Sequence, residues 1–309
     1  MRPVLIAALL CVRLSAAEEP AVAPANPPTQ ADIPYGTHER HRLDFYKAAS
    51  EKPTPLLFHV HGGGWTAGDK GKVNPKPYLD AGISVVSINY RYSWQAQLDG
   101  VVPPVKAPLE DAARALQFVR SKAAEWNIDK QRIAATGGSA GACTSLWLAM
   151  HDDMADLKST DPIARESTRL LCAAATRGQT SLDPKELIVW TPNSRYGGHA
   201  FGFMDPHNIK SRDTRFAEFL SHRDELLPLI KQYSPIELAS KDDPPIYLFY
   251  STPPAFGENQ KDPTHTANYG VKFHEKLVSL GVQSEFVYPG APDVKHPTTE
   301  AFLIDMMKR

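Results

Sequence analysis

Apolar and polar positions follow two different rhythms along the chain, and these predict strands alternating with helices. Short runs rich in β-branched and aromatic residues end at glycines or turn residues, which is typical of buried strands. Between them, apolar residues recur every three or four positions, the spacing of one helix face. The predicted strands are 56–61, 83–89, 132–136, 170–174, 246–250 and 284–288; the predicted helices begin at Pro108, after Ser139, near Tyr269 and at Thr298.

This alternation predicts an α/β protein whose central sheet is mostly parallel and covered by helices on both faces. Ligands of such sheets bind beyond the carboxyl ends of the strands, where the glycine-rich breaks of this chain fall. Residues 178–240 interrupt the rhythm with turn residues, aromatics and one charged helical stretch near 214–231. We therefore expect one domain over 35–309 that carries an insertion at 178–240.

The first residues are predicted to lie outside that domain. Arg2, a short apolar run from Pro3 to Val12, and the small residues Ser15 to Ala17 form the pattern of a secretory signal over 1–17. The Pro- and Ala-rich stretch 18–34 has no periodicity and is typical of a linker. We expect an exported protein, secreted or periplasmic.

Charge and composition exclude two classes of function. The 309 residues carry 34 Lys and Arg against 35 Asp and Glu, so the formal net charge is −1. A nucleic-acid binder that relies on a basic field does not fit this balance. The one long apolar run is the N-terminal one, so we expect no membrane span in the domain. Cys143 and Cys172 lie in apolar contexts, which favours buried free thiols, although export permits a disulfide bridge between them.

The strongest chemical motif is G-x-S-x-G at Gly137 to Gly141, between a predicted strand and a predicted helix. In this context the motif forms a nucleophile elbow, a tight turn that projects the serine hydroxyl outward. Glycines on either side prevent clashes between the strand and the crossing helix. Ser139 is therefore the predicted nucleophile. The N–H of Ala140, at the helix N-terminus, is a predicted donor to a developing oxyanion.

A second motif, His61-Gly62-Gly63-Gly64-Trp65, follows the predicted strand 56–61. Its glycines allow backbone N–H groups to turn into the cleft, as an oxyanion hole requires. His59 and His61 are two residues apart on a predicted strand, so they would face the same side and could bind a metal ion together. We set that alternative aside because no further ligand cluster with zinc spacing accompanies them. We expect no metal and no organic cofactor.

Together these motifs resemble the α/β-hydrolase serine esterases, in particular the branch of hormone-sensitive-lipase-like and bacterial feruloyl-esterase-like enzymes. The stretches 68–70 (GDK), 89–92 (NYRY) and 111–115 (DAARA) are similar to that family as well. The resemblance runs from about Pro34 to the C-terminus and is weak over 178–240. It implies Gly63 and Gly64 as oxyanion donors. It also implies that Asp69 and Asp111 brace loops by hydrogen bonds.

The resemblance further implies a base and an acid, in the chain order serine, acid, histidine. His296 is the only histidine after the last predicted strand and precedes the last helix, so it is the expected base. The acid is expected after strand 246–250, where Asp262 is preferred and Glu258 is the alternative. Asp262 immediately precedes a proline, which favours a turn that aims its short carboxylate inward. His265, in the same loop, is left as a residue of the cleft.

The predicted function is cleavage of carboxylic esters through an acyl-serine intermediate, with short-chain or carbohydrate-linked acyl esters as the expected substrates. Two alternatives remain: a peptide or amide hydrolase, since the fold does not fix the leaving group, and a non-catalytic binding protein of the same fold. Four apolar residues of the insertion either line a substrate cleft or simply pack beneath a loop. They are Tyr196, Phe201, Phe203 and Met204.

Overall fold

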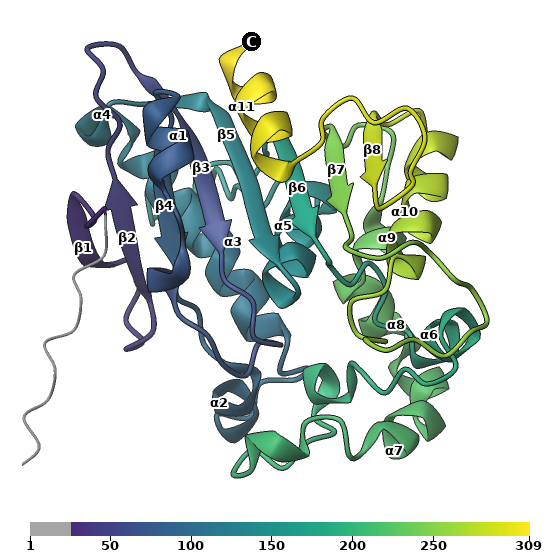
Figure 1. Ribbon diagram of the computed structural model, residues 1–309. Helices are drawn as coiled ribbons and strands as arrows, with labels where there is room; N and C mark the ends of the chain where they lie inside the picture. Colours follow the sequence, from purple (N-terminus) through teal and green to yellow (C-terminus); the bar gives the residue numbers. More distant parts are fainter. Residues whose placement is uncertain (1–25) are drawn as a thin grey trace, which may run out of the picture.

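The computed structural model describes residues 26–309, in which eight strands form one sheet (Figure 1). The predicted signal 1–17 and the first part of the predicted linker, 18–25, lie outside the described residues. The strands are β1 (Gln30–Pro34), β2 (Arg42–Tyr46), β3 (Thr54–Val60), β4 (Ser84–Ile88), β5 (Ile128–Gly138), β6 (Cys172–Thr176), β7 (Ile246–Phe249) and β8 (Ser284–Val287).

The strand order across the sheet is β1-β2-β4-β3-β5-β6-β7-β8, and the pairs from β4 to β8 are all parallel. This confirms the prediction of a mostly parallel sheet. The antiparallel strands β1 and β2 were not predicted. Residues 30–34 belong to the predicted linker but form β1, an edge strand whose mostly exposed residues give no apolar pattern to detect.

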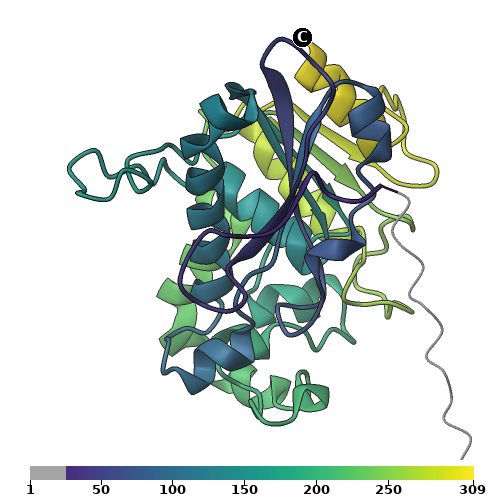
Figure 2. The same cartoon turned by 90° about the vertical axis from the view of Figure 1, so that its left-hand side faces the viewer.

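Helices cover both faces of the sheet, as Figure 2 shows from the side. The helices are α1 (Lys76–Asp80), α2 (Ser93–Leu98), α3 (Lys106–Ser121), α4 (Ala123–Trp126), α5 (Ala140–Met150), α6 (Pro184–Trp190), α7 (Phe216–Ser221), α8 (Arg223–Tyr233), α9 (Pro235–Leu238), α10 (Asn268–Ser279) and α11 (Thr299–Lys308). Three short 3₁₀ turns accompany them: η1 (Lys70–Lys72), η2 (Gly198–Phe201) and η3 (Ile209–Ser211).

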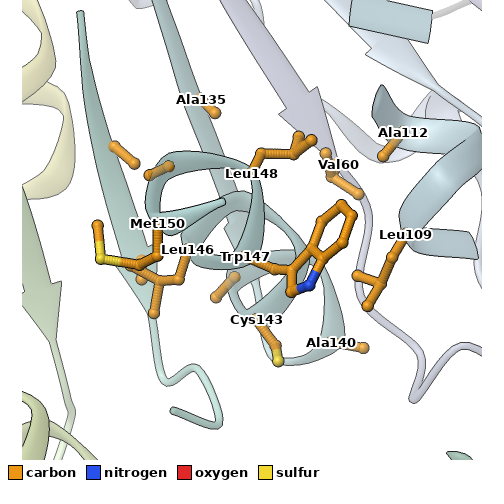
Figure 3. Packing of buried hydrophobic residues seen from close by; sticks show 14 of the residues in the cluster. Val60, Leu109, Ala112, Ala135, Ala140, Cys143, Leu146, Trp147, Leu148 and Met150 are labelled. Atoms are coloured by element: carbon orange, nitrogen blue, oxygen red, sulfur yellow. The ribbon is translucent and has the colours of Figure 1, made fainter. Parts of the chain in front are cut away.

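Side chains of β3 alternate between two cores, because successive residues of a strand point to opposite faces. Leu56 and Phe58 pack with α3, α5 and α10 in the larger core, whereas Leu57 packs with α1 and α11 in the smaller one. The helix after Ser139, α5, is buried along its whole length (Figure 3). It therefore has no polar face, and its N-terminus is fixed at the end of β5.

The segment 178–240 contains α6 to α9 and lies beyond the carboxyl ends of the parallel strands (Figure 1). The predicted helical stretch near 214–231 is two helices, α7 and α8, which meet at His222. Of the aromatic and apolar residues considered for a cleft, Tyr196, Phe201 and Met204 are buried and Phe203 packs against the larger core. The packing alternative is thus the one observed.

Candidate active site

Ser139 occupies a strained turn between β5 and α5. Its backbone angles are φ 54° and ψ −123°, in a region that residues with a side chain rarely adopt. A side chain at either Gly137 or Gly141 would collide with the carbonyl oxygen of Val60 at the end of β3. The two outer glycines of G-x-S-x-G are therefore required by close packing against β3, and this packing presses the glycine-rich loop against the nucleophile.

Ser139 is hydrogen-bonded to His265. Its Oγ lies 2.9 Å from Nε2 of His265, and Nδ1 of the same ring lies 2.8 Å from Oδ2 of Asp262. If Nδ1 donates its proton to the carboxylate, Nε2 presents a lone pair to the serine hydroxyl. The structure thus places a hydroxyl, an imidazole and a carboxylate in one chain of hydrogen bonds, which is the arrangement of a catalytic triad.

The acid and the histidine come from a single turn in the loop between β7 and α10. The His265 backbone N–H donates to the Asp262 carbonyl oxygen at 3.2 Å, so the two side chains leave the same short turn. The Asp262 side chain is 58% exposed, and that of His265 is 26% exposed. Glu258, the alternative acid, is exposed and forms no ion pair or side-chain hydrogen bond within residues 26–309.

His296, the expected base, lies elsewhere, and the expectation that it meets Ser139 is corrected. Its Nδ1 lies 2.9 Å from both carboxylate oxygens of Glu285, and its Nε2 lies 3.1 Å from Oδ2 of Asp305. Tyr247 donates a hydrogen bond to its carbonyl oxygen at 3.0 Å. Carboxylates of β8 and α11 therefore hold both ring nitrogens, and no nitrogen of His296 is left for the serine.

Sequence reasoning missed His265 because it placed the base by its order relative to the last strand. A signal was nevertheless present, since Asp262-Pro263-Thr264-His265 puts a carboxylate and an imidazole three residues apart in a predicted turn. Residues at this spacing can face each other when the chain turns once, and a proline inside the stretch favours that turn.

Amide side chains anchor the loop that carries Asp262 and His265. Gln179 donates to the Thr264 carbonyl at 2.6 Å, and Asn193 donates to that of Gln260 at 2.8 Å. Asn268 is fully buried and donates through its amide to Trp190 at 2.7 Å and to Ala255 at 3.1 Å. The segment 178–193 thus fixes the loop from both sides, which preorganises the imidazole relative to Ser139.

The residues predicted for the oxyanion hole lie around this elbow. Gly63 and Gly64 have φ angles of 111° and 62°, which only glycine adopts readily. A Cβ at the preceding Gly62 would lie 2.7 Å from the carbonyl oxygen of Gly138, so the loop runs directly against the elbow. Within the described chain, the backbone N–H groups of Gly63, Gly64 and Ala140 donate no hydrogen bond to another residue.

Two histidines near the end of β3, His59 in the strand and His61 directly after it, are held neutral by burial. Burial lowers the pKa of His59 to about 4, and that of His61 likewise to about 4. His59 pairs through Nδ1 with the Ser87 hydroxyl at 3.0 Å, and His61 pairs through Nδ1 with the Gly62 carbonyl at 2.7 Å. Each ring therefore braces the end of β3. Among residues 26–309, no group of three His, Cys, Asp or Glu side chains is placed to hold a metal ion.

Asp69 and Asp111 make the bracing hydrogen bonds expected of them. Asp69 accepts from the Gly71 backbone and from the Asn89 amide, each at 2.8 Å. Asp111 accepts from Arg91, with Nη2 to Oδ1 at 2.6 Å. Burial alone would raise the pKa of Asp111, but hydrogen bonds from His41 and Arg91 outweigh it and keep that pKa low. Both carboxylates position loops that flank the glycine-rich motif.

Both cysteines of the described chain, Cys143 and Cys172, are free and buried. Burial raises the pKa of the Cys172 thiol to about 12, so it does not act as a thiolate near neutral pH. Cys143 lies on α5, where burial also raises its thiol pKa.

No helix within residues 26–309 has the length and apolar character to cross a membrane.

The fold and the site define an α/β-hydrolase of the serine-esterase type: a mostly parallel sheet, a strained serine after β5, and an imidazole backed by a carboxylate. The chain belongs to the BD-FAE family, whose model matches residues 43–276. The match covers the glycine-rich motif 61–65, the elbow and the loop with Asp262 and His265. It ends before His296.

Individual relatives have low sequence identity to the chain. Esterase LipQ of Mycobacterium tuberculosis is 25% identical over 283 residues, which are 86% of this chain and 56% of LipQ. The chain thus spans little more than half the length of this curated relative. The acetyl ester-xyloside bifunctional hydrolase of Caldicellulosiruptor lactoaceticus has a similar structure, with a TM-score of 0.62 and 23% identity over 85% of this chain and 86% of that one. Esterase 2 of Thermogutta terrifontis, in the structure phosphonylated by sarin, has a TM-score of 0.63 and 20% sequence identity, over 92% of this chain and 94% of that one. The two structural likenesses concern the fold.

Proposed function

We propose that the protein is a carboxylic ester hydrolase that works through an acyl-serine intermediate. The observation that carries this proposal is the hydrogen-bonded chain from Ser139 through His265 to Asp262 at a nucleophile elbow. Membership of the BD-FAE family and the likeness to esterase LipQ support it.

In the proposed reaction, Ser139 Oγ attacks the ester carbonyl while His265 Nε2 takes its proton. The N–H groups of Gly63, Gly64 and Ala140 hold the oxyanion that forms. Asp262 keeps Nδ1 of the imidazole protonated and stabilises the imidazolium. His265 then returns the proton to the leaving alcohol. In the second half, His265 activates a water molecule that releases the acid from Ser139.

We propose short-chain or carbohydrate-linked esters as the substrates. One similar structure is an acetyl ester-xyloside hydrolase and another is a carbohydrate esterase from gut microbiota, which supports this choice. The proposal that the protein is exported rests on the signal pattern of residues 1–17 alone.

A fluorophosphonate probe together with an ester panel tests the proposed function. We expect the probe to label the wild-type protein and not the Ser139→Ala variant, and p-nitrophenyl acetate to be cleaved. The panel adds acetylated sugars and feruloyl sugars to identify the alcohol and the acyl group. A folded wild-type protein that neither reacts with the probe nor cleaves any ester would be a binding protein, whereas cleavage of amides in preference to esters would indicate a peptide or amide hydrolase.

A further inference from the structure

A cavity of about 490 Å³ adjoins the nucleophile elbow on the face of the sheet that α1 and α11 cover. Gly137 and Gly138, the two residues before Ser139, form part of its wall. Its other walls come from β3, β5, β6 and β7, from the end of η1 and the residues after it, from α1, and from the start of α11. The volume lies within the range of small-molecule binding sites, about 300–1,000 Å³.

The direction from which His265 approaches explains why this space is open. His265 reaches Ser139 from the loop 251–267, and neither that loop nor the segment 178–240 contributes a residue to the cavity lining. The β8–α11 connection, which holds His296, contributes only its last residues, Pro297 and Thr298. Since no catalytic side chain enters from this connection, the volume between the elbow and α11 is unfilled.

The proposed reaction assigns a direction to each part of the substrate. The leaving oxygen must face His265 Nε2, which protonates it, and the oxyanion must face the N–H groups of Gly63, Gly64 and Ala140. The acyl substituent takes the remaining direction, away from His265. We infer that the cavity beside Gly137 and Gly138 is the acyl pocket, a conclusion that rests on the proposed function.

The lining determines which acyl groups fit. Leu57 and Tyr78 are buried lining residues, and Phe249 and Val73 add partly buried apolar walls. The inner hydroxyls already have partners, because Thr136 donates to the Ala174 carbonyl at 2.8 Å and Thr176 pairs with Thr299 at 3.2 Å.

His59 also lines the cavity, where its ring pairs with the Ser87 hydroxyl at 3.0 Å and burial keeps it neutral. The pocket therefore offers a mainly apolar interior with no charge among its buried lining residues. The exposed polar side chains, Lys72, Asn74 and Glu300, belong to the rim. Such a site takes a compact, uncharged acyl group, because a charged group would lose its hydration without gaining a partner.

Substitution of Val73 tests this assignment, because its side chain lines the cavity and its backbone is ordinary extended chain at the end of η1. Val73→Trp narrows the cavity and Val73→Ala widens it. Val278→Trp, on the exposed side of α10, is the matched control, since Val278 is 58% exposed and does not line the cavity. Values of kcat/KM are measured for p-nitrophenyl acetate, butyrate and octanoate.

We expect Val73→Trp to lower the octanoate-to-acetate ratio of kcat/KM by about tenfold or more, because each excluded methylene affects discrimination strongly. Val73→Ala should raise that ratio, and Val278→Trp should leave it at the wild-type value. Thr299→Phe, from the opposite wall, repeats the test if Val73→Trp does not fold by circular dichroism.

A chain-length profile that none of the pocket variants changes would overturn the acyl-pocket assignment while acetate cleavage upholds the proposed function. Loss of the proposed function would instead show in the wild-type protein, as absence of both acetate cleavage and fluorophosphonate labelling.

Discussion

Two loops of this molecule each hold a histidine against a carboxylate, and they differ in what the second ring nitrogen meets. In the β7–α10 loop, His265 faces Asp262 on one side and the Ser139 hydroxyl on the other. In the β8–α11 connection, His296 faces Glu285 on one side and Asp305 on the other.

This difference matches the two roles that we propose, a catalytic base for His265 and a structural contact for His296. Both ring nitrogens of His296 lie within hydrogen-bond distance of a carboxylate, and neither is directed at Ser139. A ring between a carboxylate and a hydroxyl keeps one nitrogen as an acceptor. The two side chains also differ in exposure, since that of His296 is 9% exposed and that of His265 is 26% exposed.

The largest effect is expected for the nucleophile itself. Ser139→Ala should abolish ester cleavage, with a loss in kcat of about 10⁶ by analogy with other triad deletions. Removal of a hydroxyl leaves the fold intact, which circular dichroism and the unfolding midpoint check. Turnover near the wild-type rate in the folded variant would contradict the mechanism.

The two histidines are compared directly by the same substitution. His265→Asn should lower kcat by a factor approaching that of the serine variant, on the order of 10⁵–10⁶, because the nucleophile loses its base. His296→Asn should leave kcat nearly unchanged and should lower the free energy of unfolding by about 1 kcal/mol, since the partly buried Glu285 carboxylate loses a hydrogen-bond partner.

Steady-state kinetics of both variants measures the change in kcat, and urea titration measures the change in the free energy of unfolding. If His296→Asn abolishes turnover without unfolding the protein, and His265→Asn does not, the roles of the two loops are reversed.

The acid should contribute less than the base. Asp262→Asn should lower kcat by about 10⁴, because the asparagine amide no longer stabilises the imidazolium or selects its tautomer. Glu258→Gln is the matched control in the same loop and should leave kcat unchanged. A larger loss in the Glu258 variant would move the acid to Glu258, and little loss in either would mean that His265 acts with Ser139 as a dyad.

The smallest effect concerns stability and pH. His59 and His61 have pKa values lowered by burial to about 4, whereas the unfolded chain titrates near 6.5. Between these values the unfolded state binds protons that the folded state does not, so the free energy of unfolding should fall as the pH falls from about 6.5 to about 4.

The His59→Asn variant, measured by urea titration across this range, should show a shallower decline than the wild-type protein. An equally steep decline would mean that other groups cause it.

The strands and helices of the parallel region could be predicted because each buries a regular apolar pattern. The elbow could also be predicted from Gly137 and Gly141. The structure shows that the Val60 carbonyl oxygen leaves no room for a side chain at either position. Strand β1 could not be found in this way, because its residues are mostly exposed and its place depends on pairing with β2. An edge strand of this kind is defined by its partner's backbone.

The histidine of the site is the instructive failure. Both His265 and His296 lie in loops that follow strands of the parallel region, and both have acidic residues within reach in the folded chain. Glu285 and Asp305 flank His296 only after β8 and α11 pack together, a tertiary contact with no local signature. By contrast, the approach of Asp262 to His265 is local.

The shared turn of Asp262 and His265 has a consequence for how the proposed site can change during evolution. Two of the three reacting groups lie within four consecutive residues, so they are inherited, moved or lost together. The order nucleophile, acid, base along the chain is preserved, although the base lies before the last strand. The end of the sheet formed by β8 and α11 supplies none of these three groups, so its contribution to the proposed reaction is confined to the pocket wall that Pro297 to Glu300 form.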